Sequence, residues 1–362
     1  MMNVMNYKSI FFSLFLAATL QCKAQTFIKA SDPHIRYEGR IARTDSTAEL
    51  SWSATSVTIN FSGTRISAIL KDERSDNNYN IIIDGRVFNI LHPDIFKKTY
   101  RLAYNLKPGK HTLELFKRTE WAMGKTWLYG FELYGENKVL PPSPPRKHKL
   151  EFYGNSITCG YADEDSTGMD RGTSPYENGY MSYAAITARH FDAELYNISK
   201  SGIGVTVSWF PLIMSEMYDR LDATDPYSKW NFSKYTPDVV VINLFQNDAW
   251  IVKLPDNEQF KARFGKTAPT EEFIVNAYSK LVKSIRAKYP DAKIICILGS
   301  MDATEAGSPW PGYIEKAVSG LKDSNVYVHI IPYKNTKGHP SVREQQAMAD
   351  DLIGFIHKRI GW

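Results

Sequence analysis

A proline-rich run at residues 141–145, PPSPP, separates two parts of the chain that have different hydrophobic patterns. Before the run, short segments alternate between apolar and polar residues, as half-buried β-strands do. After it, apolar runs alternate with segments of helical period. Because consecutive prolines form a stiff connector, we predict a β domain at residues 25–140, a linker at 141–147 and an α/β domain at 148–362.

The amino-terminal part consists of short β-rich segments separated by turn residues. These segments lie at residues 57–61, 65–70, 80–84, 111–116 and 127–133. Asp84 and Gly85 form a hairpin signal between residues 81–83 and 87–90. Short strands with frequent turns predict an antiparallel, all-β sandwich of the jelly-roll type.

The carboxyl-terminal part alternates strands with helices. Strands are expected at residues 150–153, 193–198, 238–244, 292–298 and 326–331. The segment 238–244 is almost wholly apolar, which is typical of a parallel strand buried on both faces. Thr270 begins a clear helix that runs toward Lys288. This pattern predicts a three-layer, flavodoxin-like α/β domain around a parallel sheet.

Residues 1–24 have the features of a signal peptide. Lys8 precedes an apolar segment at residues 10–20, and residues 22–24 (CKA) offer small side chains at both cleavage positions. The apolar segment is too short to span a bilayer. Lipid attachment at Cys22 is the second interpretation. We therefore expect a secreted or periplasmic protein without a membrane span.

The composition excludes several classes of function. The net charge is only +5, from 44 basic and 39 acidic residues, and without a long basic run nucleic acid is not expected as a partner. Neither the cysteines nor the histidines show metal-ligand spacing, so we expect no metal and no other cofactor. Cys159 and Cys296 remain beyond the signal peptide, and the apolar run around Cys296 predicts a buried thiol.

The first strand of the α/β part leads into the segment GNSITCGY, residues 154–161. Its glycines permit a sharp turn that presents the Ser156 hydroxyl at the carboxyl end of the sheet. This is where α/β enzymes place their nucleophiles. On its own chemistry, however, the octapeptide favours a simpler interpretation, a turn serine that bonds its own backbone.

The octapeptide resembles the first sequence block of the SGNH, or GDSL-like, hydrolases, and its ITCGY continuation resembles carbohydrate esterase family 2. Residues 80–85 (NIIIDG) and 115–120 (LFKRTE) are similar to the amino-terminal domain of that family. The resemblance implies a secreted deacetylase of plant polysaccharides, with a jelly-roll domain before the hydrolase domain. That first domain could bind carbohydrate, or it could be a structural module packed against the enzyme.

Three further segments resemble the other blocks of the SGNH pattern, in the expected order. They are residues 200–204 (KSGIG), 245–248 (FQND) and 337–340 (KGHP). The resemblance implies that Ser156 is the nucleophile and His339 the base. It also implies an oxyanion hole made of the backbone N–H groups of Ser156 and Gly202 and the side chain of Asn247. These are the parts that ester hydrolysis by serine requires.

Two positions depart from the family pattern. Asn155 stands where the pattern has Asp, and Asn keeps the ability to form hydrogen bonds. Phe245 stands where the pattern has Gly, and it could reshape the wall of the site.

The segment that contains His339 does not supply the acid that usually orients this histidine. Many SGNH hydrolases carry an Asp two or three residues before the His, whereas positions 336 and 337 here are Thr and Lys. We therefore predict a Ser156–His339 dyad in which a backbone carbonyl accepts the other imidazole N–H. An acid from another loop, Asp248 or Asp302, is the alternative. A capping box at residues 341–344 (SVRE) should begin the next helix.

Aromatic residues near these blocks are candidates for binding sugar rings. Trp209 follows the second block and Trp250 follows the third, and core packing is equally compatible with both. Family members often carry a Trp directly before the His, and this chain has Gly338 there. The polar, Gly-rich segment 162–179 either shapes the substrate site or forms a surface loop.

Together these features predict a secreted carbohydrate O-acetylesterase that acts on plant polysaccharides of the xylan or glucomannan type through an acetyl-enzyme. The expected partner is an acetylated polysaccharide or oligosaccharide. Two alternatives remain, a lipase or other acyl esterase on the same scaffold, and a carbohydrate-binding protein with impaired catalysis. The sequence does not indicate the oligomeric state.

Overall fold

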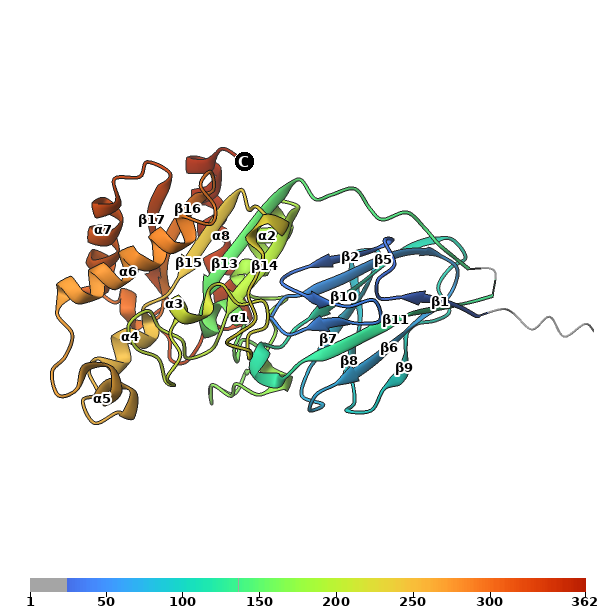
Figure 1. Cartoon of the computed structure of the whole chain (residues 1–362), viewed down its shortest axis with the longest axis horizontal. Coiled ribbons are helices and arrows are strands. Elements are labelled where there is room, and N and C mark those ends of the chain that lie inside the picture. The colour runs from blue at the N-terminus through green and yellow to red at the C-terminus, as the bar shows by residue number, and fades with distance from the viewer. Residues whose placement is uncertain (1–24, 136) are drawn as a thin grey trace, which may run out of the picture.

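The computed structural model describes residues 25–135 and 137–362, which form two domains joined by an extended segment (Figure 1). The predicted signal peptide, residues 1–24, lies outside the described residues. Within the described part of the chain, no helix combines the length and the apolar character that crossing a membrane requires.

The amino-terminal domain is a sandwich of two antiparallel sheets, which confirms the predicted all-β class. Its strands are β1 (Gln25–Lys29), β2 (Ile35–Glu38), β3 (Ala42–Arg43), β4 (Ala48–Leu50), β5 (Ser56–Ser62), β6 (Ile66–Asp72), β7 (Tyr79–Ile83), β8 (Arg86–Leu91), β9 (Lys98–Ala103), β10 (Lys110–Lys117), β11 (Thr126–Tyr134) and β12 (Lys138–Val139). One sheet has the order β3-β4-β11-β6-β9, with β1 also paired to β11. The other has the order β12-β5-β10-β7-β8, with β2 also paired to β5. The short helix η1 (Trp121–Met123) lies between β10 and β11.

The sandwich core follows from the alternating pattern of the strands. Val57, Ile59 and Phe61 of β5 are fully buried, while the residues between them are not. The predicted hairpin is confirmed: β7 and β8 pair in antiparallel fashion around Asp84 and Gly85, both with positive φ. Positive φ at both turn residues is what a type I′ hairpin requires.

The carboxyl-terminal domain is built on a five-stranded parallel sheet, as predicted. Its strands are β13 (His148–Gly154), β14 (Ala193–Ser199), β15 (Val239–Asn243), β16 (Lys293–Ser300) and β17 (Val326–Tyr333). They are arranged in the order β14-β13-β15-β16-β17, which is the flavodoxin-like order. All five carboxyl ends therefore meet at one edge of the sheet.

Helices cover both faces of this sheet and make the three layers (Figure 1). The helices are α1 (Ser156–Cys159), α2 (Tyr183–His190), α3 (Met214–Met217), α4 (Gln246–Ile251), α5 (Glu258–Phe264), α6 (Glu271–Arg286), α7 (Trp310–Leu321) and α8 (Val342–Ile360), with short 3-10 turns η2 (Ser174–Tyr176), η3 (Phe232–Lys234) and η4 (Asp302–Thr304). Residues of α6 and α7 pack with Val240 and Ile242, and residues of α2 and α8 pack with Val239 and Val241. Thr270 caps α6, so the predicted start of that helix is confirmed.

A buried ion pair joins the two domains. Arg40, from the loop after β2, places its guanidinium 2.7 Å from the Glu151 carboxylate on the interior strand β13, and both side chains are fully buried. The guanidinium also donates to the Tyr153 hydroxyl and to the carbonyls of Tyr218 and Arg220. Because buried charges are costly unless they are paired, this contact ties the sandwich to the middle of the parallel sheet.

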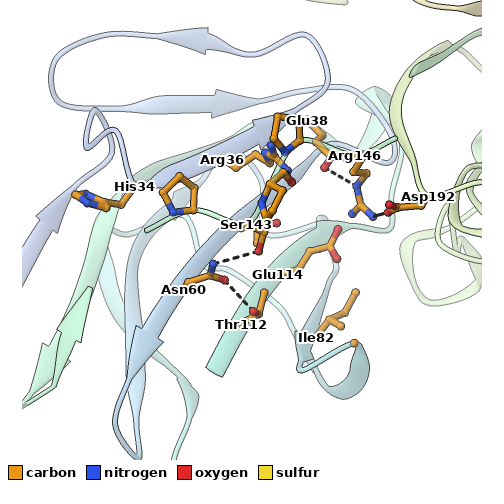
Figure 2. Close-up of a pocket in the computed structure, with 15 residues that line it drawn as sticks. His34, Arg36, Glu38, Asn60, Ile82, Thr112, Glu114, Ser143, Arg146 and Asp192 are labelled. Atoms are coloured by element: carbon orange, nitrogen blue, oxygen red, sulfur yellow. Dashed lines mark hydrogen bonds and ion pairs between the residues drawn. The ribbon is translucent and has the colours of Figure 1, made fainter. Parts of the chain in front are cut away.

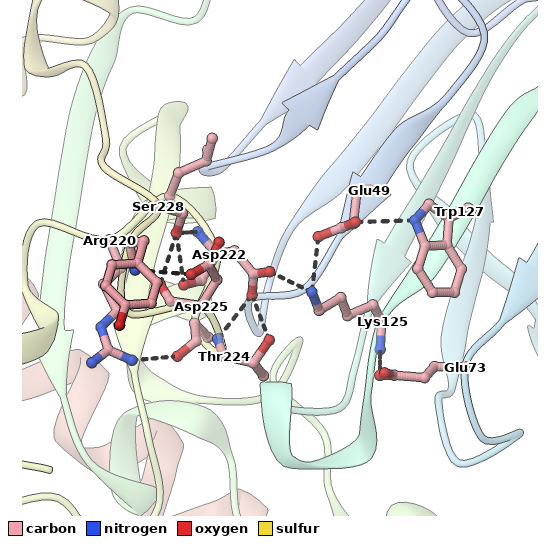
Figure 3. A network of polar contacts seen from close by, with 12 residues as sticks. Glu49, Glu73, Lys125, Trp127, Arg220, Asp222, Thr224, Asp225 and Ser228 are labelled. Carbon is pink, nitrogen blue, oxygen red and sulfur yellow. Dashed lines mark hydrogen bonds and ion pairs between the residues drawn. The ribbon is translucent and has the colours of Figure 1, made fainter.

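A second polar contact joins the domains closer to the surface (Figure 3). The Lys125 ammonium of the sandwich contacts the carboxylate of Asp222 in the α/β domain and lies 3.4 Å from the Glu49 carboxylate. The backbone and side-chain hydroxyl of Thr224 donate to the other Asp222 oxygen. This network is distinct from the Arg40 pair.

The linker lies along the sandwich and closes one side of a cavity of about 400 Å³ (Figure 2). Arg36 donates to the Pro144 carbonyl and Asn60 to the Pro141 carbonyl, which holds the proline-rich segment in place. The described lining residues are mainly polar and include neither Trp, Tyr nor Phe. Sugar sites usually offer an aromatic face, so this cavity does not have the character of a stacking platform.

Candidate active site

Ser156 is the first residue of α1, directly after β13 ends at the carboxyl edge of the sheet. The Asn155 side chain caps this short helix by accepting the Ile157 N–H at 3.1 Å, and its amide nitrogen donates to Gln246 at 2.6 Å. An aspartate could not make the second of these bonds. Asn155 therefore suits Gln246 as a partner and fixes the turn that presents Ser156.

His339 comes from the loop between β17 and α8, and its Nε2 atom lies 2.7 Å from Ser156 Oγ. The predicted capping box is confirmed, because Glu344 accepts from the backbone and hydroxyl of Ser341 at the start of α8. Two segments far apart in the sequence thus bring a serine hydroxyl and an imidazole into hydrogen-bond contact, as serine catalysis requires.

The prediction that a backbone carbonyl orients His339 is wrong. The Nδ1 atom of His339 faces the Asp170 carboxylate, with both oxygens at 2.9 Å, and the His339 backbone N–H also donates to Asp170 at 2.8 Å. Burial raises the pKa of Asp170, but its hydrogen bonds with His339 and the charge of that residue outweigh burial and lower the pKa overall. A Ser–His–Asp arrangement therefore replaces the expected dyad.

The loop between α1 and α2 brings Asp170 to the imidazole. Asp170 has a φ of +56°, a conformation that Asp tolerates better than most residues. Gly338, where family members often carry Trp, has a φ of +70°, and a Cβ there would lie 3.2 Å from the Asp170 carboxylate. The glycine before His339 therefore leaves room for the carboxylate.

Asp248 and Asp302, the alternative acids for orienting His339, form hydrogen bonds with other residues. Asp248 is fully buried and accepts hydrogen bonds from the backbones of residues 205–207 and from the Thr206 hydroxyl. Burial raises its pKa, although these hydrogen bonds oppose the shift. Asp302 accepts the indole N–H of Trp250 at 2.6 Å. In the structure, Asp248 holds the loop after β14 in shape, and Asp302 pairs with Trp250.

The predicted oxyanion donors lie on the segments that directly follow β13, β14 and β15, with Ser156 in α1 and Asn247 in α4. Among the described residues, neither the Ser156 N–H nor the Gly202 N–H has an acceptor. Gly202 has a φ of +82°, and a Cβ at that position would press against Phe210 at 3.1 Å. Glycine is therefore favoured here, and its backbone N–H remains free to bind a substrate oxygen.

Asn247 is held so that one of its amide hydrogens stays free. Its Nδ2 donates to the Ile203 carbonyl at 2.8 Å, and its Oδ1 accepts the indole N–H of Trp209 at 3.0 Å. The Trp209 contact fixes which end of the amide is oxygen. Because an amide nitrogen carries two hydrogens, the second one is available to a ligand.

Phe245 does not line the site, contrary to the expectation that it could reshape the wall. Its side chain is fully buried and packs on Tyr278 and Trp310, with ring centroids 4.7 and 5.0 Å away. Its φ of +92° explains why the family pattern has Gly at this position. Packing of the aromatic ring in the core compensates for this backbone conformation.

The aromatic candidates occupy different positions. Trp209 is 45% exposed and lies beside Gly202, so its ring is open to solvent next to the predicted oxyanion donors. Trp250 is partly buried against the core on the α2 and α8 face. Tyr161, which the sequence did not single out, has its ring centroid 4.5 Å from that of His339.

Asp170 is the main residue that the sequence analysis missed. It lies in the polar segment 162–179, one of whose two interpretations is a loop that shapes the site. The only available signal is that this loop follows Ser156, the predicted nucleophile, at the carboxyl edge of the sheet. Which of its acids would reach His339 depends on how the loop folds.

Comparison with known proteins agrees with this architecture. Residues 37–144 match the family model for the carbohydrate esterase 2 N-terminal domain, and residues 152–357 match the GDSL-like lipase/acylhydrolase family. The "Cellulase/esterase CelE" of Acetivibrio thermocellus is 35% identical over 347 residues, which are 91% of this chain and 40% of that protein. This chain therefore spans less than half of CelE.

Two further relatives are similar over most of their length. An "Acetylxylan esterase / glucomannan deacetylase" of Cellvibrio japonicus is 24% identical over 344 residues, which cover 92% of this chain and 91% of that protein. The structure of a family two carbohydrate esterase from Clostridium thermocellum in complex with cellohexaose aligns with a TM-score of 0.80 and 33% identity, over 91% of this chain and 99% of that one. The chain therefore belongs to carbohydrate esterase family 2, and it is a carboxylic-ester hydrolase of the GDSL-like type.

Proposed function

We propose that the protein is a secreted carbohydrate O-acetylesterase that removes acetyl groups from plant polysaccharides of the xylan or glucomannan type. The observation that carries this proposal is the hydrogen-bonded chain from Ser156 Oγ through His339 to Asp170. The names of the Cellvibrio japonicus relatives support the substrate class.

In the proposed mechanism, Ser156 Oγ attacks the acetyl carbonyl carbon while His339 Nε2 accepts the hydroxyl proton. Asp170 keeps the other proton on Nδ1 and steadies the imidazolium that forms. The negative oxygen of the tetrahedral intermediate is bound by the N–H groups of Ser156 and Gly202 and by the amide of Asn247. Such donors are typically worth about a hundred- to thousandfold in rate each.

The intermediate collapses when the C–O bond to the sugar breaks and His339 returns its proton to the departing sugar oxygen. An acetyl group remains on Ser156. Water then attacks this acetyl-enzyme, again with His339 as the base, and acetate leaves as the Ser156 hydroxyl is restored. The exposed ring of Trp209 lies beside the oxyanion donors, and we assign it to contact with the sugar.

The structure weakens the arguments for both alternatives. A lipase needs an apolar groove for the acyl chain, and Phe245 cannot line one, because its side chain packs into the core. A binding protein with impaired catalysis would not need an acid beside His339, whereas Asp170 supplies one. The acetylesterase is therefore the function that the geometry supports best.

Acetate release from acetylated xylan, glucomannan and pectin tests the proposal, with the Ser156→Ala variant as the control. We expect release from xylan or glucomannan, and faster turnover of p-nitrophenyl acetate than of p-nitrophenyl esters of longer acids. A preference for long acyl chains would indicate a lipase. Binding to polysaccharide without acetate release would indicate a carbohydrate-binding protein.

A further inference from the structure

The segment after β10 of the sandwich reaches into the α/β domain beside the candidate site. Glu120 is buried there, and its Oε2 atom accepts the backbone N–H of Ser201 at 2.8 Å. Ser201 directly precedes Gly202, whose N–H is a proposed oxyanion donor. We call residues 200–204 the oxyanion loop. The sandwich thus contacts this loop at Ser201, one residue before the proposed donor Gly202.

The same carboxylate oxygen also contacts the turn that carries the nucleophile. The Cys159 thiol, at the end of α1, lies 3.5 Å from Glu120 Oε2. Ser156 begins this four-residue helix. One oxygen atom therefore bridges helix α1 and the loop after β14, which bear the proposed backbone donors Ser156 and Gly202.

Glu120 is itself held firmly in place. Its backbone N–H donates to Glu177 at 3.1 Å, and its carbonyl accepts from the buried Lys117 ammonium at 3.1 Å. Burial, followed by the negative charge of Glu120, raises the pKa of Glu177 well above its ordinary value. The Glu177 contact also joins Glu120 to the loop that bears Asp170.

Trp121, the residue after Glu120, makes a parallel contact with the oxyanion loop. The Lys200 ammonium lies 3.3 Å from the centroid of the Trp121 ring and 3.8 Å from that of Phe210. Trp121 belongs to the sandwich, while Lys200 immediately precedes Ser201. Two successive residues of the sandwich thus hold two successive residues of the oxyanion loop.

We propose that Glu120 is a positioning residue for ester hydrolysis: it sets the direction of the Gly202 N–H, so that the sandwich domain forms part of the oxyanion hole. This inference rests on the proposed function of Ser156 and Gly202. It also assigns the first domain a role in the rate of the chemical step, in addition to any role in stability.

Three substitutions separate the hydrogen bond from the shape and charge of the side chain. Glu120→Gln keeps an oxygen that can accept the Ser201 N–H, Glu120→Met keeps the length without an acceptor, and Glu120→Asp keeps the charge but loses reach. Lys125→Met is the matched control, because Lys125 joins the same two domains through Asp222 away from this loop. The readouts are kcat and KM for p-nitrophenyl acetate, with folding checked by circular dichroism.

We expect Glu120→Met and Glu120→Asp to lower kcat by about ten- to a hundredfold with KM changed less than about twofold, since small misplacements of catalytic groups cost rates of this order. Glu120→Gln should stay within about threefold of the wild type, and Lys125→Met should keep kcat unchanged. If all three Glu120 variants keep kcat while melting at lower temperature, Glu120 is only structural and the inference is overturned. If Glu120→Met does not fold, the kcat of the folded Glu120→Asp variant is the test: a wild-type kcat overturns the inference, and a loss of about ten- to a hundredfold supports it.

Including Ser156→Ala in the same assay distinguishes a failure of the inference on Glu120 from a failure of the proposed function. An inactive Ser156→Ala variant with unaffected Glu120 variants overturns only the inference on Glu120. An active Ser156→Ala variant overturns the proposed function itself.

Discussion

The Nδ1 atom of His339 lies 2.9 Å from both carboxylate oxygens of Asp170, although 169 positions separate the two residues. This contact fixes the imidazole so that Nε2 faces Ser156. It links the segment after β13 to the segment after β17, at the edge where the strands of the parallel sheet end.

Asp170→Asn should lower kcat by about ten-thousandfold, because an amide can donate to Nδ1 and thereby favour the wrong tautomer of His339. Steady-state hydrolysis of p-nitrophenyl acetate measures the effect. Asp302→Asn is the matched control, since Asp302 pairs with Trp250 instead, and its kcat should change by less than about threefold. A loss below tenfold in Asp170→Asn would restore the dyad.

The sequence predicted the fold well because periodicity reports burial directly. The almost wholly apolar segment at 238–244 contains the central strand β15, and Thr270 caps α6. The SGNH-like segments placed Ser156, Gly202, Asn247 and His339 at one edge because the carboxyl ends of parallel strands converge there.

Asp170 could not be predicted in the same way. Its loop has no period, and it contains several acids with different contacts: Asp165 pairs with Arg171, whereas Asp163 is buried. The direction of the Phe245 ring was equally inaccessible, because a positive φ turns it toward Tyr278 and Trp310. Both outcomes depend on tertiary packing and backbone conformation at single residues.

Trp209→Phe should lower kcat by about tenfold. The phenyl ring keeps a surface for the sugar, but the indole N–H that fixes the Asn247 amide is lost. Asn247→Ala sets the scale, with an expected loss of about a hundred- to thousandfold. The measurement is kcat on p-nitrophenyl acetate, which has no sugar to stack. An unchanged kcat would mean that Trp209 does not orient the amide.

Arg40→Met should lower the free energy of unfolding by about 3–5 kcal/mol, because it leaves Glu151 buried without its ionic partner. Urea denaturation followed by tryptophan fluorescence measures this change. The double variant Arg40→Met/Glu151→Leu should regain much of the loss, since a buried ion pair can often be replaced by apolar side chains. A decrease of less than about 1 kcal/mol in the free energy of unfolding of Arg40→Met would show that the buried ion pair with Glu151 contributes little to stability.

Lys200 should make stability depend on pH above neutrality. Burial lowers its pKa from 10.5 to about 8, against the opposing charge of Glu120 and together with the charge of Arg220. Between these two values the unfolded chain binds more protons than the folded protein, so stability rises with pH. The free energy of unfolding of the wild type, minus that of Lys200→Met, should therefore increase by up to about 3 kcal/mol between pH 8 and 10.5.

Urea denaturation at a series of pH values measures this difference. Other groups that titrate in the same range are common to both proteins and cancel. A difference that stays constant, or that falls as the pH rises, would show that the Lys200 ammonium is not destabilised by burial between Trp121 and Phe210.

Acetate release from acetylated xylan or glucomannan by Ser156→Ala, compared with the wild type, tests the central claim most directly. The account predicts release at the rate of the buffer blank, because the nucleophile of the hydrogen-bonded chain is gone. The melting temperature should stay nearly unchanged, since the substitution removes one hydroxyl from a turn that Asn155 caps. Release near the wild-type rate by the folded Ser156→Ala protein would contradict the account.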